Sequence, residues 1–173
     1  MHSLVDETGI GTIARKENSM PEQSVTTATL ELMHIELEIP LNVAPARVFK
    51  ALTEDIDIWW DKEYSTIKRG KVVLVPEIGK PFYEDWGNGN GALVGIVTYV
   101  EKNKVLEIEG HIGMDKPAQG LLRFELIPQG QTTLLKFTHR AIGILRSYAI
   151  HVFTQGWKNL FETRLPAYLE QHE

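Results

Sequence analysis

His139 is the side chain in this sequence with the clearest capacity for chemistry. It ends the segment Leu135-Lys-Phe-Thr-His139, in which every second residue is apolar or aromatic. Residues two apart in a strand face the same side, so we expect His139 to point inward. It should lie near the place where Trp157, in the C-terminal helical segment, crosses this strand. An imidazole there could hydrogen-bond the polar end of a ligand or act as an acid or base near neutral pH. A buried, neutral histidine bonded to a backbone group is the favoured alternative.

Other patterns that support catalysis or metal binding are weaker. Glu84 and Asp85 are adjacent, and strand neighbours point to opposite faces, so they do not form the converging carboxylates of a glycosidase. The histidines lack the spacing of metal ligands, and the sequence has no cysteine. The glycine-rich stretch Gly87–Gly91 lacks the Lys-Ser/Thr pair of a phosphate-binding loop. We therefore predict no catalytic residue, no metal site and no cofactor.

Large apolar side chains form the predicted ligand-binding set. Aromatic rings offer large, stiff contact surfaces, and we expect Trp86 and Trp157 to touch a ligand most directly. Some of the aromatic residues are expected to be ordinary core instead. The predicted ligand-binding residues are Trp60, Trp86, Ile108, Leu122, Phe124, Phe137, His139, Phe153, Trp157 and Phe161.

Alternation of apolar and polar residues predicts the strands that present these side chains. A period of two with one polar face indicates a strand buried on one side only, which is typical of an antiparallel sheet covered on one face. Together the segments predict one curved antiparallel sheet of about six strands. The candidate segments, one more than that approximate count, are Glu31–Ile39, Lys71–Val75, Pro81–Trp86, Ala92–Val100, Val105–Gly110, Leu121–Ile127 and Thr133–His139.

Two short helices are predicted between the first two strands. Pro45 suits the first turn of a helix, and the apolar residues of Val43–Leu52 recur at helical spacing. Thr53, followed by two acidic residues, is typical of a new N-cap. It predicts a second helix that ends at Trp59-Trp60.

The most periodic helical segment is C-terminal, from Arg146 to Glu170. Its apolar residues step by three and four, which predicts a stripe, including Ile150, that faces the sheet. Pro166 is expected to bend it. A curled sheet under one long helix is not filled completely by side chains, so we expect an apolar cavity between them.

The bulk composition limits the classes of partner. A net charge of −5, with no basic cluster beyond Lys68-Arg69, argues against nucleic acid. No apolar run approaches the roughly 20 residues that span a bilayer, so we predict no membrane insertion. The lack of cysteine and of a signal-like apolar core predicts a cytoplasmic protein. We expect residues 1–28 to be a flexible polar arm and residues 29–173 to be the folded domain, as a monomer or a homodimer.

Three segments resemble a known family. Ile39–Thr53 (IPLNVAPARVFKALT) followed by Ile58-Trp-Trp60 resembles the opening of the START-like, or Bet v 1-like, helix-grip (SRPBCC) domains, in the branch named for the Hsp90 ATPase activator Aha1. Leu135–Ala141 (LKFTHRA) and Thr154–Leu160 (TQGWKNL) are similar to that branch's last strand and Gly-Trp helix. Phe82–Trp86 (FYEDW) is similar to its bacterial members.

The resemblance implies an α+β helix-grip fold with a hydrophobic cavity. Members of the superfamily include carriers, cyclases and co-chaperone modules, and a shared fold does not choose among these activities. Our leading interpretation is a domain that binds an apolar, lipid-like small molecule, with the long helix and the loop Gly110–Gly120 as the gate. One alternative is a cyclase- or hydrolase-like enzyme that uses His139 with Tyr99, Tyr148 or Arg146. Another is a module that activates an Hsp90-type chaperone ATPase.

Overall fold

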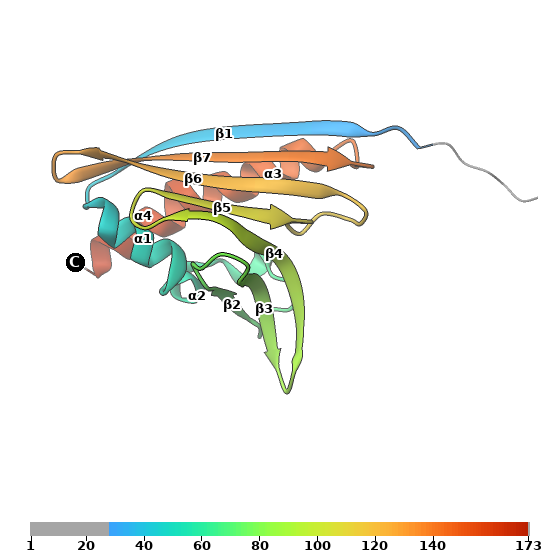
Figure 1. Ribbon diagram of the computed structural model, residues 1–173, viewed down its shortest axis with the longest axis horizontal. Coiled ribbons are helices and arrows are strands. Elements are labelled where there is room, and N and C mark those ends of the chain that lie inside the picture. The colour runs from blue at the N-terminus through green and yellow to red at the C-terminus, as the bar shows by residue number, and fades with distance from the viewer. Residues whose placement is uncertain (1–27, 173) are drawn as a thin grey trace, which may run out of the picture.

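The computed structural model describes residues 28–172, so nearly all of the predicted polar arm lies outside the described residues. Figure 1 shows one antiparallel sheet whose strands follow the order β1-β7-β6-β5-β4-β3-β2. The predicted α+β class is confirmed, with seven strands in place of about six. The strands are β1 (Glu31–Leu41), β2 (Lys71–Leu74), β3 (Pro81–Gly87), β4 (Asn90–Glu101), β5 (Val105–Gly110), β6 (Gln119–Gln129) and β7 (Thr132–Gly143).

The inward face of the sheet follows the alternation in the sequence. In β1, residues 33, 35, 37, 39 and 41 are buried, and their neighbours are exposed. In β7 the same alternation buries Leu135, Phe137 and His139. Register is fixed because a shift of one residue would bring the polar set of side chains to the core.

The sheet bends where β4 meets β5. A Cβ atom on Gly110 would lie 2.4 Å from the carbonyl oxygen of Val94, and one on Gly95 would lie 2.8 Å from that of Glu109. Only residues without a side chain permit so close an approach of the two backbones. In Figure 1, β4 curves away from the plane of β1, β7 and β6 and carries β3 and β2 with it.

Two short helices and a 3₁₀ turn connect β1 to β2. They are α1 (Pro45–Thr53), α2 (Ile56–Trp59) and the turn η1 (Lys62–Tyr64). The expected N-cap at Thr53 is wrong, because Thr53 is the last residue of α1 and its hydroxyl donates to the carbonyl of Phe49 at 2.8 Å. Such a bond to the residue four positions earlier satisfies the hydroxyl inside the helix.

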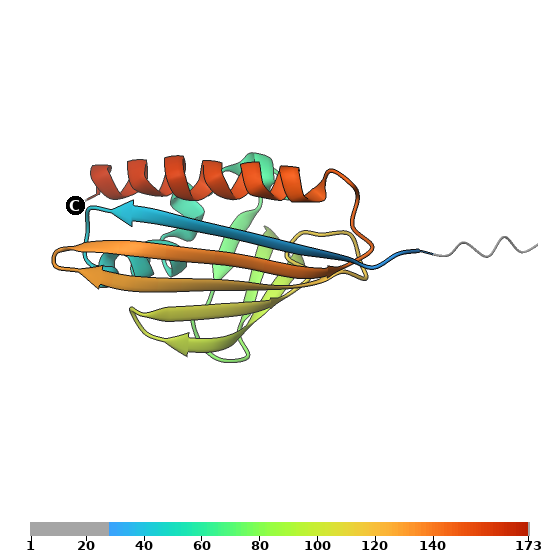
Figure 2. The same ribbon diagram turned by 90° about the horizontal axis from the view of Figure 1, so that it is seen from above.

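The long C-terminal helix lies across one face of the sheet (Figure 2). It consists of α3 (Ala149–Lys158), a π-helical turn η2 (Asn159–Arg164) and α4 (Leu165–Gln171). In the π turn the N–H of Leu165 donates to Leu160, five residues back. Pro166 follows directly; because it has no N–H to donate and its ring crowds the preceding turn, the predicted distortion takes the form of this wider turn. Ile150, expected on the inner stripe, is 51% exposed.

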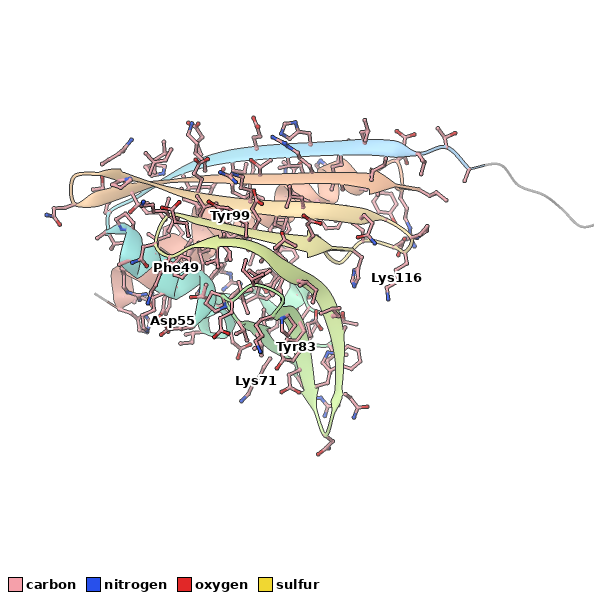
Figure 3. The ribbon with its side chains drawn as sticks, in the orientation of Figure 1. Phe49, Asp55, Lys71, Tyr83, Tyr99 and Lys116 are labelled. Atoms are coloured by element: carbon pink, nitrogen blue, oxygen red, sulfur yellow. The ribbon has the colours of Figure 1, made fainter. Side chains whose placement is uncertain are left out.

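Asp55 fastens the end of this helix to α1. Its carboxylate accepts hydrogen bonds from the Tyr168 hydroxyl (2.8 Å), from Lys50 Nζ (2.8 Å) and from Arg47 (3.2 Å). Desolvation opposes the charged form, but the bonds from Lys50 and Tyr168 outweigh it and hold the pKa of Asp55 below its ordinary value. Figure 3 shows Asp55 beside the helices that it joins. The C-terminal end of the cover is therefore held in place by charge and hydrogen bonding.

The glycine contact at the bend gives a direct test of the fold. Gly110→Ala is expected to lower the free energy of unfolding by on the order of 3 kcal/mol, since the new methyl group meets backbone atoms that cannot move alone. Gly156→Ala is the matched control in α3: its Cβ would lie 3.4 Å from the Tyr64 ring, an ordinary contact. Because alanine has a higher helix propensity than glycine, this control should raise the free energy of unfolding by about 1 kcal/mol. Urea denaturation of both variants measures the two effects, and equal stabilities would contradict the proposed constraint.

Candidate ligand-binding site

A cavity of about 310 Å³ lies between α3 and the bent part of the sheet. Its walls come from β2, β3 and β4, from the segment Glu63–Thr66, from the segment His111–Gly113 after β5, and from the helix. Binding pockets for small molecules have volumes of roughly 300–1,000 Å³, so the space suits a small organic ligand. We call it the helix cavity. Its lining residues are Trp60, Glu63, Tyr64, Ser65, Thr66, Val72, Phe82, Glu84, Ala92, Val94, His111, Ile112, Gly113, Val152, Phe153, Gly156, Trp157 and Leu160.

Aromatic rings form one wall of the helix cavity. The Trp60 ring packs edge-on against Phe82, with 5.9 Å between ring centroids, and against Trp157, with 6.3 Å. These edge-to-face pairs hold the rings in fixed orientations. The wall is therefore stiff, and a ligand that contacts it loses little protein entropy on binding.

On the other side of Trp157 the interior is filled. Trp157 stacks on Phe161 with 5.6 Å between centroids and 7° between ring planes. Phe161 in turn packs against Phe137 at 4.7 Å and Phe124 at 5.7 Å. The remaining space here is about 10 Å³, too small for an organic ligand. Trp157 thus separates a packed aromatic core from the helix cavity.

The ten predicted ligand-binding residues fall on both sides of this division. Trp60, Phe153 and Trp157 line the helix cavity. Five belong to the packed core, namely Ile108, Leu122, Phe124, Phe137 and Phe161. Trp86 is half-buried behind Glu84, and its indole N–H donates to that carboxylate at 3.1 Å. The tenth, His139, does not line the cavity itself but is buried directly behind its wall, where its ring packs against Phe153 and Trp157.

His139 points inward as expected, and its nearest partner is a side chain. The Trp157 indole N–H donates to Nδ1 at 3.1 Å, which places the imidazole proton on Nε2 because indole is a donor only. A Cβ on Gly120 would lie 3.0 Å from Nε2 and 2.9 Å from Met114 Cε. Within the described part of the chain, Nε2 has no hydrogen-bond partner. Burial lowers the pKa of His139 to about 4, since water no longer stabilises the charged ring.

Glu84 is a polar wall residue that the sequence did not single out for this role. The side chain is 6% exposed and lines the helix cavity. Its carboxylate accepts from the backbone N–H of Thr66 at 2.8 Å and from the Thr66 hydroxyl at 3.2 Å. The alternation of β3 was a usable signal, because Phe82 and Glu84 share a face and Phe82 is buried.

Two further polar residues reach the helix cavity from loops. His111 accepts from the N–H of Gly113 at 3.1 Å through Nδ1, and its Nε2 bonds to the carbonyl of Leu93, so the protein itself uses both ring nitrogens. Ser65 Oγ is buried and has no partner among residues 28–172. No periodic pattern marks either position, because loop residues follow turn geometry.

The entrance lies beside the first turns of α3. Val152 and Tyr64 line the helix cavity and are 52% and 44% exposed. The segment between β5 and β6 comes next to α3, and Asp115 there pairs with Arg146 at 2.8 Å. The start of the loop that we predicted as a gate, His111–Gly113, lines the helix cavity, whereas the exposed Asp115–Arg146 pair lines a neighbouring hollow of about 220 Å³.

Other possible sites are less enclosed. Hollows of about 390 Å³ and 590 Å³ lie on the outer side of the sheet, at the β4–β5 edge and at the β3–β4 hairpin. Over residues 28–172, no group of three or more His, Asp or Glu side chains is arranged to hold a metal ion. No helix in that range is long and apolar enough to cross a membrane.

The arrangement of one long helix across a curved antiparallel sheet is shared with solved structures. A protein from Mesorhizobium loti, MLL2253, aligns with a TM-score of 0.60 at 22% identity, covering 81% of this chain and 98% of its own. Ara h 8.0201 aligns with a TM-score of 0.59 at 14% identity, covering 82% of this chain and 100% of its own. An HSP90 activator from Plasmodium falciparum aligns with a TM-score of 0.60 at 17% identity, covering 80% of this chain and 96% of its own. These similarities establish a Bet v 1-like helix-grip fold.

The sequence itself matches a family model. The model described as "Activator of Hsp90 ATPase homolog 1-like protein" matches residues 42–170. That range covers most of the chain, so the chain belongs to this family, and the resemblance found in the sequence is confirmed. A comparison with curated protein sequences gave no match.

The buried histidine predicts a pH dependence of stability. In the unfolded chain His139 titrates near its ordinary pKa of 6.5, whereas in the fold it titrates at about 4. Between these values the unfolded state binds more protons, so stability falls as pH drops. From pH 7 to pH 5 this group should cost about 2 kcal/mol of folding free energy.

His139→Asn isolates that contribution. Its amide oxygen lies where Nδ1 lies in histidine, so it still offers Trp157 an acceptor but does not titrate. Urea denaturation at pH 7 and pH 5 should show a smaller loss of stability in the variant than in the unsubstituted protein, by about 2 kcal/mol. An identical loss in both would mean that His139 is protonated in the fold at pH 5.

Proposed function

We propose that the chain binds a small, largely apolar molecule in the helix cavity. The observation that carries this proposal is the unfilled space of about 310 Å³ beside an interior that is otherwise tightly packed. Trp60, Phe153 and Trp157 provide apolar contact surface. The family and its fold neighbours support a domain of this architecture.

Ligand entry is proposed to occur where the loop after β5 meets α3. The Asp115–Arg146 pair is exposed on both sides, with side chains 64% and 63% accessible. Exposed ion pairs contribute about 0–1 kcal/mol, so this contact can open at little cost. We propose that the loop moves with each binding event.

The enzymatic alternative receives little support from the geometry. His139 does not line the helix cavity, because its ring lies behind the wall residues Phe153 and Trp157. Tyr99 is 45% exposed on β4 (Figure 3), and Tyr148 bonds Arg146 at the surface. Among residues 28–172, the one side chain hydrogen-bonded to His139 is Trp157, which is a donor without acid–base chemistry. An acid–base reaction needs groups that meet at one substrate atom.

A cavity-filling substitution tests the proposal. Val94 lines the helix cavity, and its neighbour Leu93 is 51% exposed on the opposite face of β4. Val94→Phe should weaken binding of the neutral fluorescent probe N-phenyl-1-naphthylamine by about tenfold or more, because the added ring occupies the space. Leu93→Phe is the matched control and should bind as the unsubstituted protein does. Absence of saturable binding to the unsubstituted protein, or equal binding by both variants, would refute the site.

A second candidate function is activation of a chaperone ATPase. The family's description and the similarity to the Plasmodium falciparum HSP90 activator support it. This function would use the outer surface of the domain and would not require an occupied cavity. A chaperone is thus a proposed partner. That the domain acts as a monomer or a homodimer is a prediction.

The two candidates give different results in one assay. If the domain activates an Hsp90-type chaperone, purified protein should raise the chaperone's ATP turnover without any added small molecule. Val94→Phe should keep that stimulation, since the substitution is internal. Equal turnover with and without the protein would rule out the chaperone role.

A further inference from the structure

The helix cavity contains a buried carboxylate that has no cationic partner. Glu84 is 6% exposed, and no Lys, Arg or His within residues 28–172 forms an ion pair with it. The nearby lysines are engaged elsewhere: Lys62 pairs with Asp57, and Lys68 pairs with Glu63. A buried charge without a counter-charge is costly, and such groups are usually paired. The Glu84 carboxylate therefore calls for a cationic partner that residues 28–172 do not supply.

The hydrogen bonds to Glu84 leave it able to bind a further donor. The protein supplies three donor groups, the Thr66 N–H, the Thr66 hydroxyl and the Trp86 indole N–H, and the Thr66 N–H is shared between the two carboxylate oxygens at 2.8 and 3.0 Å. Three hydrogens thus serve the about four acceptor positions of a carboxylate, so an ammonium can contribute a fourth hydrogen in place of one half of the shared bond. The bonds from Thr66 and Trp86 also fix the orientation of the carboxylate at the cavity wall.

A second polar atom in the cavity wall, the Oγ of Ser65, has no hydrogen-bond partner within the part of the chain that the structure describes. Ser65 directly precedes Thr66, and its Oγ is buried without a hydrogen bond within the described residues. Ser65 and Glu84 both line the helix cavity. A ligand group with several hydrogens could therefore bond both at once, because ammonium has three donors.

The charge of the walls selects the sign of the ligand. Among the described residues, the lining includes Glu84 and Glu63, of which Glu63 pairs with Lys68, and contains no lysine or arginine. His111 uses both ring nitrogens on the backbone of Gly113 and Leu93. An anionic ligand such as a fatty acid would meet the negative charge of Glu84 at this end, which the neutral hydroxyl of Ser65 does not offset. A cation would be favoured by Glu84 and also by the faces of the aromatic wall.

We infer that the helix cavity takes an amphipathic organic cation, a molecule with an apolar body and a primary ammonium group. The ammonium bonds Glu84 and Ser65 Oγ, and the apolar body lies along Trp60, Phe153 and Trp157. This inference rests on the proposed binding function and adds the chemical class of the ligand.

Three probes that share one alkyl group and differ in their polar end separate this inference from the binding function on which it rests. Octylamine, 1-octanol and octanoate compete with N-phenyl-1-naphthylamine at pH 7 and constant salt. We expect octylamine, which is an ammonium ion at this pH, to bind about tenfold more tightly than octanol and octanoate to bind most weakly. Equal affinity for octylamine and octanol would overturn the inference and leave the binding proposal intact. Failure of the naphthylamine and of all three probes would overturn both.

Substitutions locate the effect. Glu84→Gln should remove the preference for octylamine over octanol. Glu109→Gln, which makes the same charge change at an exposed position outside the helix cavity, should keep the preference. If Glu84→Gln does not fold, as judged by circular dichroism, Ser65→Ala provides a milder variant that should reduce the preference in part. Retention of the full preference in the folded Glu84→Gln variant, or in Ser65→Ala where that variant replaces it, would overturn the inference.

Discussion

The contact between β4 and β5 at Gly95 and Gly110 determines the interior of this protein. The two backbones approach so closely there that a Cβ on Gly110 would lie 2.4 Å from a carbonyl oxygen. This approach lets the sheet bend, and β4, β3 and β2 turn out of the plane of the other strands (Figure 1). A helix is a straight rod, so it cannot follow both halves of a bent sheet. One half packs tightly against it and the other half diverges.

This division gives the helix two roles along its length. Near its middle, Trp157 and Phe161 stack and fill the interior against Phe137 and Phe124. Toward its N-terminal end, Phe153 and Val152 face open space. The C-terminal end is held by Asp55 through Tyr168. Because the anchor and the packed core lie on one side of the cavity, the helix can allow movement at the mouth while it remains fixed elsewhere.

The polar groups of the helix cavity come from segments outside the packed aromatic core. Glu84 is an inward-facing residue of β3, in the bent part of the sheet, and the loop at Thr66 donates hydrogen bonds to it. His139, in contrast, lies within the packed half, where its ring bonds Trp157 and burial keeps it neutral. The residue with the clearest potential for chemistry thus serves the core, and a carboxylate beside a loop provides the charge of the site.

The sequence by itself determined the elements and the faces that they bury. Period-two alternation placed Leu135, Phe137 and His139 inward, and helical spacing located the cover, because both patterns depend on local backbone geometry. It did not separate core from cavity: Phe124 and Phe153 have the same apolar character, yet only Phe153 lines the space. Only the tertiary structure decided this, along with the roles of Glu84 and Ser65. The bend of the sheet relative to the helix is a long-range property, and neither residue type nor spacing encodes the distance between two packed layers.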